Sequence, residues 1–293
     1  MMGPPPAGLE GVPGGIIPLF LPLPARVFER RAARFRELAP GHAVGDYLAA
    51  LAALAEAQRV ACQQLPDVPE GHDPPVDVPH RVAEARQEDA WRAPLRVILS
   101  EMKGARLPDP ARAAMARLEK STPEELAALA GALLTHAYDQ IDLATAPFVA
   151  AALQVSWTAL AASLPLDAIQ RGDRGCPVCG SPPVAARVLG DDRLRYLVCS
   201  LCATEWHLTR VVCATCGAPD RISYFAIEGD PGAVKAEACG GCRTYLKLFY
   251  LEKIPWAEPF ADDVATLSLD LLMAEEKYSR SGVNLFLLPG VQP

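Results

Sequence analysis

Hydrophobic positions in the first 170 residues follow the spacing of helices, with Ala, Leu, Arg and Glu as the dominant residues. A first helix is predicted from Ala25 to the Pro40-Gly41 stop, and a second from Asp46, a typical N-cap residue, to about Gln64. Further helices are predicted over 81–103, 109–119, 122–140 and 144–163. Because strand-like alternation is almost absent before residue 170, this part of the chain is predicted to be a multi-helical domain.

The pattern changes near Gly172, where short runs of β-branched and aromatic residues begin to alternate with glycines and cysteine pairs. The runs at 195–198, 221–227 and 245–250 predict the strands of a small β module. Helical periodicity returns from Ala261 to Arg280, Gly282 ends this predicted helix, and an apolar tail follows at 285–290.

Two apolar stretches need a separate interpretation. Residues 1–24 contain seven prolines, which disfavour a helix, and the apolar part 18–24 is predicted to lie in a groove of the body. Residues 143–166 carry no charge and are long enough for a bilayer. Alanine, Gln154, Ser156 and Thr158 contribute little to membrane insertion, so a buried core helix is predicted there and no membrane span.

The overall composition excludes several classes of protein. With 293 residues, of which 51% are hydrophobic and 22% charged, the chain can bury a core and is not disordered overall. A net charge of −7 argues against a protein that coats nucleic acid. The N-terminus lacks the basic and hydrophobic regions of a secretory signal, so a cytoplasmic location is predicted.

The cysteines form the strongest pattern in the sequence. Eight of the nine lie in Cys-x-x-Cys pairs separated by gaps of 19, 10 and 22 residues, namely Cys176/Cys179, Cys199/Cys202, Cys213/Cys216 and Cys239/Cys242. In a cytoplasmic protein such pairs predict metal binding rather than disulfides. Joining the first pair with the second and the third with the fourth gives two closed tetrahedral sites. Four thiolates accept either iron or zinc, so the predicted cofactors are two tetrahedral metal ions of either kind.

An internal repeat supports this pairing. Gly180 and Gly217 each follow the second cysteine of a knuckle, a position that favours positive φ, and Thr204 and Thr244 each lie two residues after the last ligand. The module is therefore predicted to be a tandem duplication of one rubredoxin-like or zinc-ribbon unit. A thioredoxin-type redox pair would need a βαβ setting, and iron–sulfur clusters fit the ligand count but not the knuckle spacing as well.

Outside the cysteine pairs, the sequence contains no Ser/His/Asp set, phosphate loop or paired carboxylates, so an enzyme is not predicted. Residues 171–256 carry 11 Lys or Arg and 9 Asp or Glu without the basic cluster of a nucleic-acid ribbon. Glu205, Trp206 and His207 have two open interpretations, which are contacts to a partner or strand residues packed beside the metal site. Cys62 is predicted to be an inert buried thiol.

Several blocks of the sequence resemble the formate dehydrogenase accessory protein family, FdhE. The blocks are GCPVCGSPPV at 175–184, RLRYL at 193–197, CSLCATEWH at 199–207, KAEAC at 235–239, CRTYLK at 242–247, DDVATL at 262–267 and NLFLLPG at 284–290. In the N-terminal half the resemblance is limited to 18–24 and the helix that follows. Generic zinc ribbons do not combine TEWH after the second knuckle with this C-terminal tail.

The resemblance implies a cytoplasmic bacterial protein that binds the catalytic subunit of respiratory formate dehydrogenase before export and is needed for its activity. It also implies rubredoxin-like sites that can hold iron. The alternative function is a rubredoxin-like electron carrier that acts on the same subunit. The sequence leaves the oligomeric state open, a homodimer included, and predicts no nucleic-acid partner.

Together these patterns predict an α+β fold, in which a multi-helical N-terminal domain precedes two tandem rubredoxin-like units and a C-terminal helix. The predicted regions are a proline-rich apolar segment at 1–24, the helical domain at 25–170, the first four-cysteine unit at 171–210, the second at 211–256, and the C-terminal helix and tail at 257–293.

Overall fold

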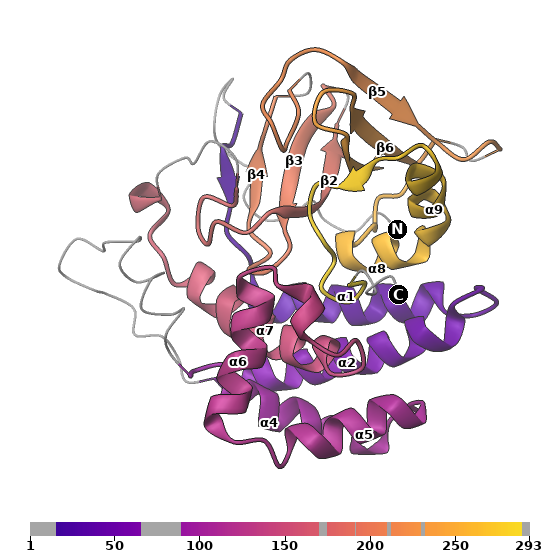
Figure 1. The fold of residues 1–293 in the computed structure, drawn as a ribbon. Coiled ribbons are helices and arrows are strands. Elements are labelled where there is room, and N and C mark those ends of the chain that lie inside the picture. The colour runs from indigo at the N-terminus through magenta and orange to yellow at the C-terminus, as the bar shows by residue number, and fades with distance from the viewer. Residues whose placement is uncertain are drawn as a thin grey trace, which may run out of the picture.

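The protein consists of a helical layer and a mixed β-sheet (Figure 1). Of the two short helices near the C-terminus, the one at 259–265 packs between these layers, and the one at 267–275 packs against the second half of the sheet. The computed structural model describes residues 16–65, 89–169, 175–190, 192–209, 212–229 and 232–288. One hydrophobic core extends through both layers and includes the four cysteines of the first unit. The predicted α+β class is therefore confirmed.

Within the described ranges, six helices form the first layer, and most of their bounds follow the predicted periodicity. They are α1 (Pro24–Leu38), α2 (Gly45–Gln63), α4 (Arg92–Glu101), α5 (Asp109–Leu118), α6 (Pro123–Leu134) and α7 (Ala146–Ala162). Short 3-10 turns occur at Met102–Gly104, Tyr138–Gln140 and Leu166–Ala168. The charge-free stretch forms α7, which is buried along most of its length, mainly by α2, α4 and α6. Among the described residues, no helix combines the length and hydropathy needed to cross a bilayer.

Two helices of this layer are shorter than predicted. The helix expected over 122–140 ends at Leu134, and His136 then adopts a left-handed φ of 62° that a helix cannot continue through. Its start is as predicted, because the Thr122 hydroxyl and the Glu125 carboxylate form a capping box. The helix expected over 81–103 begins at Arg92, and residues 81–88 lie outside the described part of the chain.

The sheet has the strand order β1-β4-β3-β2-β7-β6-β5, and β8 pairs with β7. Its strands are β1 (Leu19–Phe20), β2 (Pro183–Leu189), β3 (Leu194–Cys199), β4 (Glu205–His207), β5 (Ile222–Phe225), β6 (Val234–Cys239), β7 (Thr244–Tyr250) and β8 (Ser279–Arg280). Within each four-cysteine unit the strands pair antiparallel, but β2 and β7 pair in parallel between the units. The two units therefore share one continuous sheet.

A buried ion pair also joins the two units. Arg195 on β3 is completely buried and donates to the Glu237 carboxylate on β6. The same guanidinium donates to the backbone oxygens of Leu208, Thr209 and Val212, which belong to the link between the units. One side chain thus fixes both the linker and the second unit.

The C-terminal helix predicted from 261 to 280 is wrong in its extent. The chain forms α8 (Pro259–Ala265) and α9 (Leu267–Glu275), which are separated at Thr266. The Thr266 hydroxyl donates to the Asp262 carbonyl oxygen, and its backbone leaves the helical region. Lys277 then takes a positive φ of 59°, and Arg280 extends into β8 instead of a helix.

The apolar segment at 18–24 reaches the body by backbone pairing rather than by lying in a groove. Its residues form edge strand β1, in which Leu19 pairs with Trp206 of β4. The His207 amide donates to the Pro18 carbonyl oxygen at 3.0 Å. Pro24 then begins α1, so this segment connects the edge of the sheet with the helical layer.

Candidate metal centres

The structure brings the eight paired cysteines together as two groups of four, in the pairing predicted from the sequence. Each group joins a knuckle that precedes a strand to a knuckle at the end of the next hairpin. Within each group the four sulfur atoms lie within 4.8 Å of one another. The first group is Cys176, Cys179, Cys199 and Cys202, and the second is Cys213, Cys216, Cys239 and Cys242.

Distances between the sulfurs agree with a tetrahedral site. In the first group Cys176 and Cys202 are 3.5 Å apart, and in the second group Cys213 and Cys242 are 3.7 Å apart. Cys216 and Cys239 lie at 3.8 Å. A tetrahedron with metal–sulfur bonds of about 2.3 Å separates its sulfurs by about 3.8 Å, so the second group already has that spacing.

The backbone of the two groups repeats closely. Gly180 and Gly217 have φ values of 77° and 76°, as the sequence repeat predicted. The first knuckle of each group closes with the same backbone hydrogen bond. The Cys176 amide donates to the Ser181 carbonyl oxygen, and the Cys213 amide donates to that of Ala218, both at 2.9 Å. After the last ligands, Ala203 and Arg243 both take left-handed φ values, 58° and 59°.

Each group also has a knuckle whose amides point at a sulfur, although the two knuckles do not occupy matching positions in the repeat. The amides of Leu201 and Cys202 point at the Cys199 sulfur at 3.3 and 3.4 Å. In the second group the amides of Thr215 and Cys216 point at Cys213 at 3.4 and 3.5 Å. Amide donors stabilise a thiolate, which is the form that binds metal.

The pKa values of the cysteine thiols in the first group show why four sulfurs at this spacing fit a metal cation. Burial raises the pKa of the Cys176 and Cys199 thiols well above their usual range. Burial acts in the same direction on Cys179, but hydrogen bonds from Cys176 and the other neighbouring thiols outweigh it and lower its pKa. Four thiolates can therefore share this space only if a cation offsets their charge, and an ion held by four sulfurs has no open coordination position.

The three residues singled out after the second knuckle lie on β4, between β1 and β3. Glu205 accepts a hydrogen bond of 2.6 Å from the Arg187 guanidinium. Trp206 is buried, with 8% of its surface exposed, and the His207 ring packs edge-on against Tyr196. All three therefore have structural contacts within the sheet.

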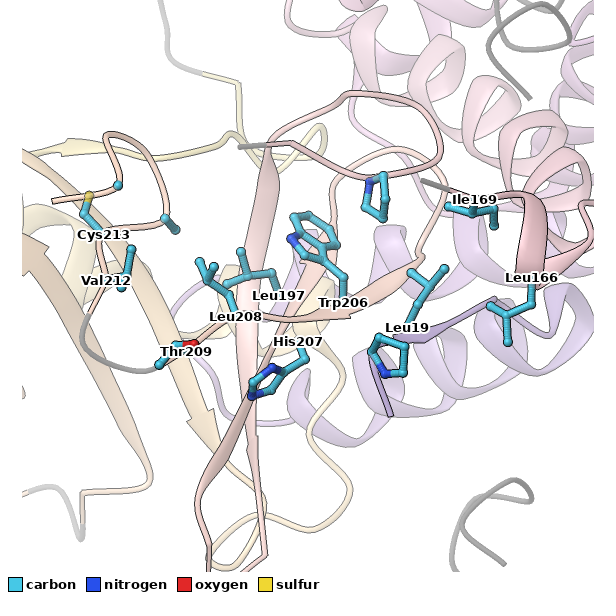
Figure 2. Close-up of a pocket in the computed structure, with 14 residues that line it drawn as sticks. Leu19, Leu166, Ile169, Leu197, Trp206, His207, Leu208, Thr209, Val212 and Cys213 are labelled. Atoms are coloured by element: carbon cyan, nitrogen blue, oxygen red, sulfur yellow. The ribbon is translucent and has the colours of Figure 1, made fainter. Parts of the chain in front are cut away.

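Trp206 and His207 also line a cavity of about 400 Å³ between the two four-cysteine groups (Figure 2). Its walls include Pro177 from the first knuckle of the first group and Cys213 from the first knuckle of the second group. Leu19 of β1 and Leu166 after α7 form the wall nearest the helical layer. The cavity has both polar and apolar walls and reaches one knuckle of each group.

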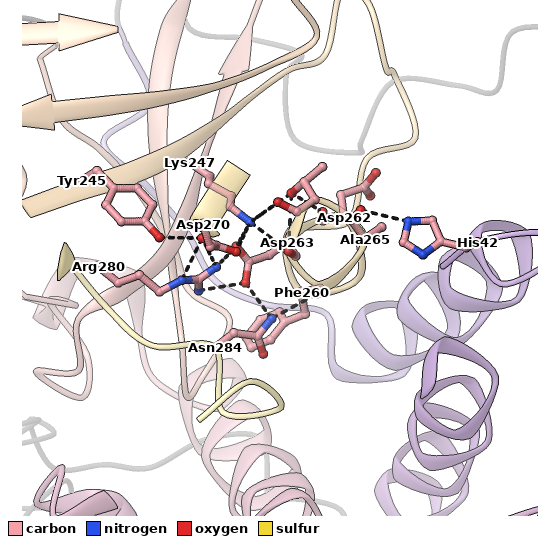
Figure 3. A network of polar contacts seen from close by, with 11 residues as sticks. His42, Tyr245, Lys247, Phe260, Asp262, Asp263, Ala265, Asp270, Arg280 and Asn284 are labelled. Atoms are coloured by element: carbon pink, nitrogen blue, oxygen red, sulfur yellow. Dashed lines mark hydrogen bonds and ion pairs between the residues drawn. The ribbon is translucent and has the colours of Figure 1, made fainter. Parts of the chain in front are cut away.

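A buried polar network near the C-terminus was not predicted from the sequence (Figure 3). Lys247 on β7 contacts Asp263 at 3.1 Å and Asp270 at 2.7 Å, and Arg280 contacts the same two carboxylates. Asn284 donates to Asp263 at 3.0 Å. Lys247 is 2% exposed and Asp263 is fully buried, so the charges offset one another in the interior.

Polar side chains also join the second knuckle of the first group to the helical layer. Gln154, buried in the middle of α7, donates to the Ser200 carbonyl oxygen at 3.0 Å, and Ser200 lies between Cys199 and Cys202. The Gln154 oxygen accepts from Arg31 of α1 at 2.9 Å, and Arg31 in turn pairs with Glu258. Gln154, which argued against a membrane span in the apolar sequence of α7, therefore joins the helical layer to the first cysteine group.

Comparisons with known proteins agree with this architecture. The FdhE N-terminal, central and C-terminal domain models match residues 16–173, 175–210 and 211–287. The Protein FdhE homolog of Cronobacter sakazakii is 39% identical over 292 residues, which cover 94% of this chain and 92% of the relative. Protein FdhE of Salmonella paratyphi A is 40% identical with the same coverage.

A solved structure also matches this chain over nearly its whole length. The crystal structure of the FdhE protein from Pseudomonas aeruginosa superposes with a TM-score of 0.83 at 35% identity and covers 94% of this chain and 100% of that one. The matches extend over both layers and both cysteine groups, so the chain belongs to the FdhE family of formate dehydrogenase accessory proteins.

Proposed function

We propose that this protein acts in the cytoplasm as a maturation factor that binds the catalytic subunit of a respiratory formate dehydrogenase before export. The two metal ions, held by the eight paired cysteines, stabilise the surface that binds this subunit and do not catalyse a reaction. The observation that carries the proposal is the pair of closed four-sulfur groups in one sheet, because such sites leave no coordination position for a substrate.

A titration of the two metal forms tests this proposal. Zinc-loaded and iron-loaded protein are each titrated calorimetrically with the isolated catalytic subunit. Both forms are expected to bind with dissociation constants within about fivefold of each other, which corresponds to about 1 kcal/mol. Cys199→Ser, which removes one ligand, serves as the negative control. Binding by the iron form alone would overturn the scaffold role, and binding by neither form would overturn the proposed partner.

The second candidate function is a rubredoxin-like electron carrier. It is favoured by the partial exposure of Cys216 and Cys242 in the second group, since electron transfer requires a ligand near the surface. A reversible one-electron potential in the iron form, together with reduction or oxidation of the catalytic subunit, would support this function. Retention of full maturation activity by the zinc form would exclude it, because zinc is redox-inert.

Glu205, Trp206 and His207 are proposed as contacts for the catalytic subunit. His207 is the most suitable to test because its side chain is partly exposed and lines the cavity between the knuckles. His207→Ala is expected to weaken binding without loss of metal, measured by the same titration and by metal content. His42→Ala is the control, since His42 contacts the Ala265 carbonyl oxygen and does not line the cavity (Figure 3). Equal affinity of both variants would assign β4 a structural role only.

A further inference from the structure

The two four-cysteine groups have the same ligands and the same backbone but differ in burial. In the first group no cysteine has more than 4% of its surface exposed. In the second group Cys213 and Cys239 are buried, whereas Cys216 and Cys242 are only half-buried. The ligand spacing and the left-handed residues of the knuckles repeat, but the residues between the ligands differ, and the two groups differ clearly in burial.

The surroundings of the first group explain its protection. All four of its cysteines belong to the main hydrophobic core, together with Val178 and Leu201 from the two knuckles. Gln154 of the helical layer donates a hydrogen bond to the Ser200 carbonyl oxygen, between Cys199 and Cys202. The cavity between the groups touches Pro177 but none of these four cysteines, so a chelator is expected to reach their sulfurs only after the helical layer and the sheet have separated locally.

The second group lies at the surface. Gly217, Gly241 and Arg243, which flank the half-buried ligands, are exposed. Cys213 lines the wall of the cavity described above, so the group is approached from that side as well (Figure 2). The Thr244 hydroxyl contacts the Cys242 sulfur at 3.1 Å and the Thr215 hydroxyl at 3.0 Å. Thr215 in turn donates to the Ser281 hydroxyl at 2.9 Å, so this polar support comes from the second unit and the C-terminal segment.

We propose that the second group is an exchangeable metal site and the thiol-reactive part of the protein, whereas the first group holds its ion permanently. The inference rests on the proposed metal binding by both groups. Exchange is a ligand substitution without oxidation. A donor atom of an incoming ligand bonds to the ion, the bond to Cys242 or Cys216 breaks, and the released thiolate takes a proton from water. The ligands that fit are small soft donors, thiols above all, and heterocyclic chelators.

Zinc release from the full-length protein tests the proposal. Protein loaded with two zinc ions is mixed with excess pyridylazoresorcinol, and the absorbance of the zinc complex is followed. One zinc ion is expected to leave at least about tenfold faster than the other, because the buried site requires local opening first. Cys242→Ser should abolish the fast phase and keep the slow one. Release of both ions in a single phase would overturn the proposal.

The matched variant at the first group, Cys202→Ser, affects a core residue and is expected to destabilise the sheet, so a second measurement uses the unmutated protein. The zinc-loaded chain is alkylated with N-ethylmaleimide for increasing times and mapped by peptide mass spectrometry. Cys216 and Cys242 are expected to react before any cysteine of the first group. Earlier labelling of Cys176 or Cys202 would overturn the assignment. A protein that binds no zinc in either group would instead contradict the metal binding on which the proposed function depends.

Discussion

The helical layer and the cysteine-bearing sheet bury their side chains by different means. In the helical layer, alanine-rich helices pack closely, and Ala150, Ala151 and Ala152 on α7 are completely buried. In the sheet, each unit has only short hairpins, and the cysteine groups occupy the positions where a larger domain would place apolar side chains. A unit of about 35 residues buries too little surface to fold alone. Metal is therefore expected to stabilise the sheet and to contribute little to the helical layer.

Removal of one ligand should produce the largest effect. Cys199→Ser is expected to unfold the first unit while most helical structure remains, because metal binding supplies on the order of 10 kcal/mol to small metal-dependent units. Near-UV circular dichroism reports on aromatic packing in both layers, so part of the signal should be lost, from Tyr196 of the sheet, while the far-UV signal of the helices persists. Cys62→Ser, which changes the lone half-buried thiol of α2, is the control and should alter neither signal. Simultaneous loss of both layers would contradict this division.

The next largest effect concerns the buried polar network. Lys247→Met leaves Asp263 and Asp270 with Arg280 as their only cation among the described residues, and it is expected to cost about 3–5 kcal/mol. Urea unfolding of the metal-loaded protein measures this cost. The exposed pair of Lys103 and Glu119 in the helical layer gives the comparison, because Lys103→Met should cost less than about 1 kcal/mol. Equal costs would show that the network contributes no more than a surface ion pair.

Stability at low pH should depend on Asp263. Burial by itself would raise the pKa of this carboxyl, but the charges of Arg280 and Lys247 outweigh burial and lower the pKa to about 2. Because the folded-state pKa lies below the unfolded one, the stabilisation is complete above about pH 4–5 and is lost as the pH falls towards 2. The loss amounts to about 2 kcal/mol.

Thiolates also take up protons in acid, so the measurement compares the intact protein with Asp263→Asn between pH 5 and 3 by urea unfolding. The difference in unfolding free energy between the two proteins should shrink as the pH falls. A difference that stays constant over this range would be inconsistent with an ionised Asp263 in the network.

The smallest of these effects is expected at the contact between the layers. Gln154→Leu keeps the volume of the side chain but leaves the Ser200 carbonyl and the Arg31 guanidinium each without one partner. The expected cost is about 1–2 kcal/mol in thermal unfolding, since both groups are buried. The exposed Gln140 supplies the control, and Gln140→Leu should leave the melting temperature unchanged. A stabilising Gln154→Leu would mean that the layers pack better without this polar bridge.

Features fixed by neighbouring residues could be predicted from the sequence. The knuckle geometry follows from the glycines at 180 and 217, and α7 follows from a long apolar run with helix-forming residues. Strands β2 and β6 were missed because they are rich in alanine, which has a low strand propensity, and both gain their burial from neighbouring strands.

Features that depend on distant residues could not be predicted. The polar network joins Lys247 to Asp263, Asp270 and Arg280, and charged residues at helical spacing are usually solvated rather than buried. The same network explains the wrong helix end, because Arg280 is held beside the two carboxylates, in β8 and beyond the end of the helix. The sequence signal that could have indicated a buried polar network was the pair of adjacent acids Asp262 and Asp263 in an otherwise apolar segment.

The parallel pairing of β2 with β7 has a consequence for how the chain acquires its fold. Ala186 and Leu248 are partners although they are 62 residues apart, and contacts between such distant residues form slowly. Until they meet, β2 and β7 each present an uncovered edge with apolar neighbours, which is the kind of surface through which nascent chains aggregate. In the finished sheet both edges are covered, and the outer positions are left to the two-residue β1 and the four-residue β5. A chain shortened after residue 210 would keep β2 permanently uncovered on that side, so the first unit should aggregate when it is produced without the second.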